Sequence, residues 1–392
     1  MKIIVESHIF PDSLVGKLSS SSKAGLDFAA HNFSQAMLSG FKENETDVCV
    51  INVPSVGSYP LLNKCFRIPS VNIDSGISIP FYNVPYFKRF EIVRNKLKYI
   101  ESYMRTIASH EDVVYITYNL KSREYLSELK RIRPTLKICS IITDLPENMN
   151  TPKQFGIFKK KGTSTDDINT DLIDGFILFA PLMAERLHVG NRPWIHLEGI
   201  YNPEGASCRV AKEKFKTILY TGNLGRKYGV MEMLKAFSMI KDSNYRLWIR
   251  GGGECETLVR QEAERDNRVE FFESMGRKQI IELQHKATIL LNPVKPSESF
   301  TRYFFPSKTL EYMASGTPVL MYHLDCMPQE YNNYVYYIKD EDVETLSNTI
   351  IETCSRPQEE LNSFGARAAA FINQYKTPKS QTKRIVDFVL SL

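Results

Sequence analysis

A lysine and a glutamate stand three residues apart in the stretch FPSKTLEYMASGTPVL. Its proline is favoured in the first turn of a helix, so the pattern predicts a helix start at Ser307, Lys308 and Thr309. Amides and an ammonium group at such a start suit a diphosphate. Glu311 follows at a rise of roughly 4.5 Å, where a carboxylate can accept the hydroxyls of a ribose. The alternative is an ordinary Lys–Glu pair on a helix surface.

Two glycine-containing turns precede this stretch. In TGNLGRKYGV, Gly222 marks a turn, and Arg226 and Lys227 stand just before a helical run. Such a turn can present amides and a guanidinium to a phosphate, although a polar strand-to-helix loop is the alternative. In IRGGGE, the glycines around Gly252 allow a backbone to approach a flat ring closely, or simply to turn tightly.

The elements that must position these residues follow from an alternation of short β-branched runs with longer amphipathic runs. We expect an α/β protein with two Rossmann-like, doubly wound domains facing each other across a cleft, at residues 1–203 and 204–373. A Ser-rich loop at residues 18–23 is expected before a helix that starts near Ala24 and Gly25 and ends at Gly40. Strands are expected at residues 2–5, 48–53, 113–117, 137–142, 175–179, 216–220, 245–250, 269–272, 287–291, 318–322 and 335–338.

The composition is that of an ordinary globular protein, with 43% hydrophobic and 24% charged residues in 392. The net charge of +5 is too small to indicate nucleic acid. The seven cysteines form no CxxC pair and the histidines show no metal spacing. With no expected signal peptide or membrane span, we expect a cytoplasmic protein without a metal or cofactor.

The order and spacing of TGNLGRKYG, IRGGGE and FPSKTLEYMASGTPVL resemble the retaining nucleotide-sugar glycosyltransferases of family 4, which have the GT-B fold. The resemblance implies a nucleotide diphosphate sugar as donor, most simply a UDP-sugar, and no required metal. Glu311 matches the second glutamate of the family's Glu-x7-Glu motif, which binds ribose. Arg226 or Lys227 matches the basic diphosphate-binding loop, and Ser307 and Lys308 fall where backbone amides contact phosphate. In that fold a final helix, here residues 374–392, crosses back to the first domain.

The sequence departs from the family pattern at two places. Tyr303 stands where the first motif glutamate is expected, and Glu298 is a candidate to replace it. Asp144, in IITDLPENM, takes the place of a family histidine near the reacting sugar. A carboxylate there can orient a hydroxyl or assist deprotonation, or it can cap a turn before Pro146. The Asp-Leu-Pro-Glu variant that begins at Asp144 and the Phe-Pro-Ser-Lys variant that ends at Lys308 both resemble one bacterial surface-polysaccharide sub-branch of the family.

A turn at Lys23, Ala24 and Gly25 resembles the family's glycine turn near the donor phosphates, with an ordinary helix start as the alternative. The segment between Phe81 and Arg105 mixes aromatic and basic residues. It is typical either of a peripheral contact with the inner face of an anionic membrane or of a helix with a solvated basic face.

The sequence therefore predicts a glycosyltransferase that moves a hexose-type sugar to a glycan or lipid-linked acceptor. Asp144, Arg226 and Lys308 are its expected catalytic residues, and the basic groups stabilise the departing diphosphate. The missing glutamate and histidine leave open a non-catalytic partner subunit that binds glycan or polypeptide. Another two-domain sugar-nucleotide enzyme, such as an epimerase, fits the motif order less well.

Overall fold

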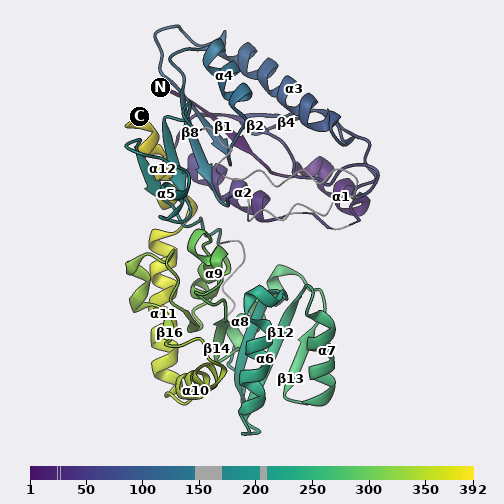
Figure 1. Cartoon of the computed structure of the whole chain (residues 1–392), viewed down its shortest axis with the longest axis vertical. Coiled ribbons are helices and arrows are strands. Elements are labelled where there is room, and N and C mark those ends of the chain that lie inside the picture. Colours follow the sequence, from purple (N-terminus) through teal and green to yellow (C-terminus); the bar gives the residue numbers. More distant parts are fainter. Residues whose placement is uncertain (24, 27, 146–169, 204–209) are drawn as a thin grey trace. The chain divides into compact units, whose positions relative to one another are not determined.

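The computed structural model of the chain describes residues 1–23, 25–26, 28–145, 170–203 and 210–392. The chain forms two compact units, one made of Met1–Asn202 with Pro378–Leu392 and the other of Pro203–Thr377. Figure 1 shows that each unit contains a sheet covered by helices. Ala24, the linker residues 204–209 and the stretch that follows Leu145 lie outside the described residues.

The sheet of the first unit has the strand order β10-β9-β8-β7-β1-β2-β5-β4, and every pair is parallel except β4 with β5. Its central strands are continuous apolar runs because both faces are covered by helices. A separate antiparallel pair joins β3 to β6. The strands are β1 (Lys2–Ser7), β2 (Val48–Asn52), β3 (Arg67–Ile68), β4 (Val71–Ile73), β5 (Gly76–Ser78), β6 (Phe81–Tyr82), β7 (Val113–Tyr118), β8 (Lys137–Ile142), β9 (Gly175–Leu178) and β10 (Trp194–His196).

The helices of this unit correct two expectations. The Ser-rich stretch is the end of a helix, not a loop, and the next helix begins at Phe28. Gly40 lies inside that helix and is not its C-cap. A Cβ at this position would collide with Pro378 and Thr382, so the glycine permits close packing of the two helices. The helices are α1 (Asp12–Ser21), α2 (Phe28–Glu43), α3 (Phe87–Met104), α4 (Arg123–Ile132), α5 (Met183–Arg186) and α12 (Pro378–Leu390).

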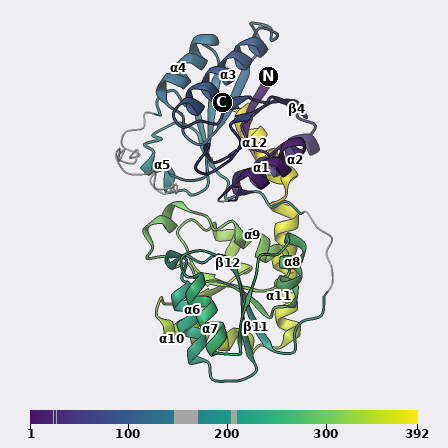
Figure 2. The same cartoon turned by 90° about the vertical axis from the view of Figure 1, so that its right-hand side faces the viewer.

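The last helix, α12, belongs to the first unit and packs against α2, as Figure 2 shows. Ile385, Phe388 and Val389 enter the same apolar core as the strand residues Ile3 and Val50. The preceding helix ends at Tyr375, so the crossing helix starts slightly later than the expected residue 374.

The second unit has the strand order β13-β12-β11-β14-β15-β16, with all pairs parallel. This is the 3-2-1-4-5-6 order of the Rossmann fold, in which ligands bind at the carboxyl ends of strands near the switch point, here between β11 and β14. The strands are β11 (Lys216–Asn223), β12 (Tyr245–Gly252), β13 (Val269–Phe272), β14 (Ile289–Asn292), β15 (Val319–Tyr322) and β16 (Tyr336–Ile338).

Helices connect these strands as the alternating sequence pattern predicts. The α-helices are α6 (Val230–Met239), α7 (Glu256–Arg265), α8 (Arg277–Lys286), α9 (Lys308–Ala314), α10 (Val343–Cys354) and α11 (Gln358–Tyr375). Three short 3-10 helices, η3 (Arg226–Tyr228), η4 (Ser299–Tyr303) and η5 (Gln329–Asn333), lie in the loops. The predicted doubly wound α/β architecture is confirmed in both units.

Candidate functional site

Lys308 and Gly222 meet at the switch point of the second sheet. Gly222 lies at the end of β11, and Lys308 begins α9, which follows the long loop after β14. The Lys308 Nζ atom lies 4.1 Å from the ring centroid of Tyr220. It is 3.4 Å from the position that a Cβ would take at Gly222, whose φ of +144° favours glycine. The ammonium group therefore sits directly beside the strand end.

The Lys308 ammonium has no counter-ion in the part of the chain that the structure describes. It forms neither an ion pair nor a hydrogen bond there, so the alternative of a Lys308–Glu311 surface pair is wrong. The ammonium lies over the ring of Tyr220 in a cation–π contact. Burial lowers the pKa of Lys308 to about 7, because a desolvated ammonium without an anion is costly. This arrangement favours binding of an anionic group.

Tyr312 fixes α9 to the end of β11. It lies one helical turn after Lys308, is fully buried, and its hydroxyl donates to the carbonyl oxygen of Thr221 at 3.0 Å. The same hydroxyl accepts from the Thr221 amide at 2.7 Å. These bonds satisfy buried backbone groups that would otherwise be unpaired. Sequence reasoning missed Tyr312, although its i+4 spacing from Lys308 placed it on the same helix face.

Glu311 is oriented by a residue of the preceding helix. The Gln284 side chain, fully buried on α8, donates from Nε2 to Oε1 of Glu311 at 2.6 Å. The Gln284 backbone is fixed in turn, because its carbonyl oxygen accepts from the Thr317 hydroxyl at 2.7 Å. Glu311 itself is only half-buried. One carboxylate oxygen is thus engaged by the protein, and no described residue donates a hydrogen bond to the other.

Two positions at the end of β12 leave no room for a Cβ. They are Gly251, within the strand, and Gly253, just after it, on either side of the predicted Gly252. A Cβ at Gly251 would strike the Gly222 carbonyl, and a Cβ at Gly253 would lie 2.8 Å from the backbone of Leu224. Gly253 also has a φ of +152°. By contrast, a Cβ at Gly252 would meet only a side-chain oxygen at 3.7 Å. The turn therefore brings β12 close to the β11 loop, and it leaves room for a Cβ at Gly252.

The predicted basic residues of η3 lie on the loop after β11 and have partners. Arg226 is exposed; its amide donates to Oε1 of Glu254 at 2.8 Å, and its Nε lies 3.9 Å from the same oxygen. The Lys227 ammonium lies 5.2 Å from the ring of Tyr228 and 4.9 Å from that of Phe300. No recorded contact joins either side chain to Lys308.

The remaining predicted residues of this unit lie between η4 and α9. Tyr303 is the half-buried last residue of η4, and Glu298 precedes η4 with no side-chain capping bond. Ser307 is exposed just before α9, which has only seven residues. Thr309 is fully buried and accepts a hydrogen bond of 3.4 Å from Asn292, so it anchors the helix from inside.

In the first unit, Asp144 follows β8 at the carboxyl edge of the sheet and is half-buried. The neighbouring Thr143 amide donates to Oδ1 of Asn119 at 3.0 Å, which fixes the turn. Gly25 is exposed with a φ of +79°, and its carbonyl oxygen accepts from the Ser22 hydroxyl at 2.6 Å. These residues belong to a different unit from Lys308 and Glu311.

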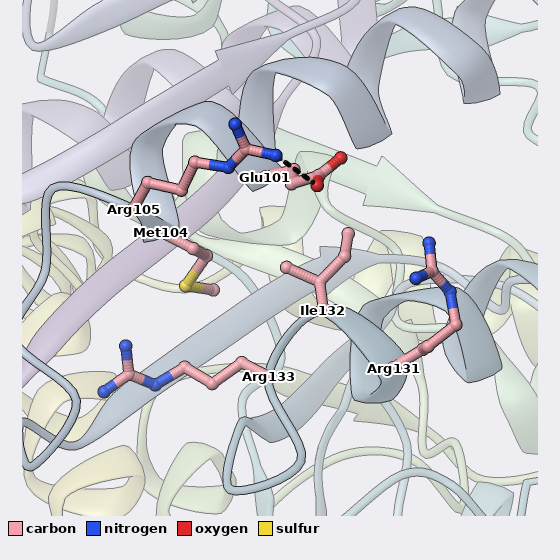
Figure 3. Close-up of a pocket in the computed structure, with 6 residues that line it drawn as sticks. All are labelled: Glu101, Met104, Arg105, Arg131, Ile132 and Arg133. Carbon is pink, nitrogen blue, oxygen red and sulfur yellow. Dashed lines mark hydrogen bonds and ion pairs between the residues drawn. The ribbon is translucent and has the colours of Figure 1, made fainter.

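A pocket in the first unit lies at the C-terminal ends of α3 and α4. Figure 3 shows it, lined by Glu101, Met104, Arg105, Arg131, Ile132 and Arg133. Arg105 pairs with Glu101 at 2.8 Å, and Arg133 donates to the carbonyl oxygen of Ala108 at 2.9 Å. Both α3 and α4 end here, and helix C-termini favour cations. We assign this pocket no ligand.

Within the described ranges, no three His, Cys, Asp or Glu side chains are grouped so that they could hold a metal ion. Over the same ranges, every helix is too short or too polar to cross a membrane.

Comparison with known families gives a match at the site just described. Residues 209–371 match the model for glycosyl transferases group 1. The second unit carries a glycosyltransferase domain. A comparison with curated protein sequences gives no match.

Solved structures extend this likeness to both units. Sucrose-phosphate synthase from Thermosynechococcus elongatus is 12% identical with a TM-score of 0.61, over 100% of this chain and 99% of that one. A mutant of TarM from S. aureus, solved with UDP, is 11% identical with a TM-score of 0.61, over 99% of each chain. The lipopolysaccharide outer core galactosyltransferase WaaB is 13% identical with a TM-score of 0.60, over 100% and 99%. The fold is therefore GT-B, as expected.

Proposed function

We propose that this glycosyltransferase is a retaining enzyme that transfers a sugar from a nucleotide diphosphate, most simply UDP, to a glycan or lipid-linked acceptor in bacterial polysaccharide assembly. The observation that carries the proposal is the Lys308 ammonium, which lies beside Gly222 without a counter-ion. A diphosphate supplies the missing negative charge. The UDP in the TarM structure supports this choice of donor.

Glu311 then binds the ribose of the same nucleotide. Gln284 engages Oε1 of Glu311, which leaves Oε2 to accept hydrogen bonds from paired hydroxyls. Lys308 and Glu311 are three residues apart on one short helix, and Tyr312 fixes that helix to β11. The helix thereby sets the spacing between phosphate and ribose.

In the reaction, the bond between the sugar C1 and the diphosphate oxygen breaks, and a bond from C1 to the acceptor oxygen forms on the same face. The acceptor proton passes to the departing diphosphate. Asp144 orients the acceptor hydroxyl or assists its deprotonation. Lys308 stabilises the negative charge that develops on the leaving group, together with Arg226 and Lys227 of η3, which follow Gly222 in the sequence. No metal is required in this proposal.

Ligand binding is the first test. We expect UDP, or else GDP or ADP, to raise the melting temperature of the full chain, and Lys308→Met to abolish that rise. Lys235→Met, which changes an exposed lysine on α6, is the matched control and retains it. If none of the three nucleotides stabilises the protein, the donor assignment is wrong.

Turnover is the second test. The protein is incubated with a panel of nucleotide sugars, and released nucleotide is measured with and without glycan acceptors. Release from one donor, with the anomeric configuration of the product retained, supports the proposal. Nucleotide binding without any release across donors and acceptors would favour the partner-subunit interpretation.

A further inference from the structure

Five aromatic rings form a continuous row on the first unit. The ring centroids are 5.5 Å apart from Tyr59 to Phe66 and 5.4 Å from Phe66 to Tyr82. The row continues at 6.4 Å from Tyr82 to Phe87 and at 6.3 Å from Phe87 to Phe90. We call these five residues the aromatic ladder. It is built from two chain segments, which the antiparallel pairing of β3 with β6 brings together.

Much of the ladder faces solvent. Phe66 is 52% exposed, Phe87 50% and Phe90 63%. Two large side chains close to it in sequence are exposed as well, Leu61 at 60% and Tyr86 at 82%. These five account for much of the large apolar side-chain exposure of the described chain. Such a concentration indicates an interaction surface, because exposed apolar groups are otherwise scattered.

The backbone at Tyr86 adds a second observation. Tyr86 has a φ of +64°, which is strained for a bulky residue and costs on the order of 1–3 kcal/mol. It stands immediately before α3, and the strained turn occurs at the most exposed aromatic side chain of the ladder region. The backbone strain at Tyr86 is retained although its ring is exposed to solvent. This combination favours a binding role for the exposed aromatic side chain.

The charge around the ladder is strongly positive. Arg67 lies 5.4 Å from the ring of Tyr82, and Arg89 is exposed within the first turn of α3. Between Tyr59 and Arg105 the only acidic residues are Asp74, Glu91 and Glu101. The basic residues of that interval are Lys64, Arg67, Lys88, Arg89, Arg94, Lys96, Lys98 and Arg105.

One face of α3 packs against the unit. Lys96, Ile100 and Met104 are buried against the unit, and the Lys96 ammonium pairs with the buried carboxylate of Glu6. On the opposite face of α3, Arg89, Arg94 and Lys98 are exposed. Only its first turn, together with the β3–β6 pair and the preceding loop, presents exposed rings.

We propose that the aromatic ladder and a basic rim, which consists of the exposed Lys64, Arg67 and Arg89, form a docking surface for an anionic phospholipid bilayer. Phe66, Phe87 and Phe90 would lie in the interfacial layer. Aromatic rings favour that layer, and basic side chains near it are attracted to anionic lipid. This inference rests on the proposed function in one respect, because a lipid-linked acceptor would be presented at such a surface.

Two other occupants fit less well. A second copy of this chain, related by two-fold symmetry, would bring two basic rims together, and like charges repel. A neutral glycan would gain nothing from the positive rim. Phenylalanine, which has no polar group for sugar hydroxyls, supplies three of the five ladder rings. An anionic bilayer uses both the rings and the charge.

Vesicle flotation with the full chain tests the docking surface. We expect binding to phosphatidylcholine vesicles containing about a third phosphatidylglycerol, and at least tenfold weaker binding to phosphatidylcholine alone. The double variant Phe87→Ser, Phe90→Ser should lose at least tenfold, and Arg67→Gln or Arg89→Gln about fivefold each. Leu390→Ser and Arg131→Gln, exposed on other helices of the same unit, are the matched controls and should bind as the parent does.

Several outcomes would overturn the inference. These are absence of binding to anionic vesicles, equal binding by the double serine variant, or a ladder-dependent dimer in sedimentation without vesicle binding. Stabilisation by UDP is measured on every variant as a separate readout, since Lys308 lies in the other unit. In the parent protein, absence of binding to anionic vesicles with UDP stabilisation intact rejects only the docking surface, whereas vesicle binding without UDP stabilisation rejects only the donor site.

Discussion

Gln284 and Glu311 are joined by a hydrogen bond of 2.6 Å between a buried amide and a half-buried carboxylate. The bond connects α8 to α9 and fixes the carboxylate orientation before any ligand arrives. Gln284 does not need to touch a nucleotide to matter. It acts through Glu311 as a positioning residue, and its effect on binding should therefore depend on the ribose hydroxyls.

Gln284→Ala should weaken UDP binding about tenfold, and Glu311→Ala at least as much, because one or two hydrogen bonds to a charged group are lost. Both variants should bind 2′,3′-dideoxy-UDP about as well as the parent does. Isothermal titration with the two nucleotides measures this selectivity. A loss that is equal for both nucleotides would show a general structural defect and contradict the ribose assignment.

Lys308→Met should stabilise the protein while removing nucleotide binding. The pKa of Lys308 is lowered to about 7 in the folded state, from an ordinary value of about 10.4 in the unfolded chain. The unfolded state therefore binds more protons between pH 7 and 10.4, and the cost of the buried charge is fully present below pH 7. We expect the variant to gain about 1–3 kcal/mol at pH 6, with the gain vanishing near pH 10. Urea unfolding of both proteins measures it, and destabilisation at pH 6 would contradict the prediction.

Nucleotide binding should take up a proton above neutral pH. A diphosphate beside Lys308 raises its pKa from about 7, because an opposite charge favours the ammonium form. At pH 8 we expect uptake of roughly one proton per nucleotide bound, with affinity falling by up to about tenfold per pH unit above 7. Calorimetry in buffers of different ionisation enthalpy counts the protons. The Lys308→Met variant, if it retains any binding, should show no such uptake at pH 8.

Gly253→Ala and Gly252→Ala form a matched pair of neighbouring substitutions. Gly253 has a positive φ, and a Cβ there would lie 2.8 Å from the Leu224 backbone, whereas a Cβ at Gly252 would make only an ordinary contact of 3.7 Å with the Glu256 side chain. We expect Gly253→Ala to lower the free energy of unfolding by about 1–3 kcal/mol and to disturb nucleotide binding. Gly252→Ala should change stability by less than about 1 kcal/mol. Similar destabilisation by both would mean that the turn tolerates no Cβ at all, contrary to the geometry described.

The sequence predicted the architecture because both sheets are parallel, and buried parallel strands appear as apolar β-branched runs between helices. All of the predicted strands are present, from β1 to β16, with ends shifted by a few residues. The short strands β3, β4, β5, β6 and β10 were missed, since they are too brief to show periodicity. Gly40 was misassigned because a glycine at a helix–helix contact looks the same in sequence as a C-cap.

Only part of the candidate site could be predicted from the sequence. Lys308 and Glu311 were recognised from their spacing, but that spacing alone could not show that Lys308 lacks a counter-ion. Tyr312 and Gln284 became visible only in three dimensions. Gln284 in particular lies on another helix, 27 positions before Glu311, and local patterns carry no information about such contacts.

The return of α12 to the first unit has a consequence for biosynthesis. On the ribosome, residues 1–202 emerge before the segment that completes their core, while residues 203–377 already form a unit of their own. Phe388 and Val389 fill that core last. The first half of the chain must therefore keep an apolar groove along α2 uncovered throughout translation of the second half, and a ribosome that stalls before codon 378 leaves it open to chaperones and proteases.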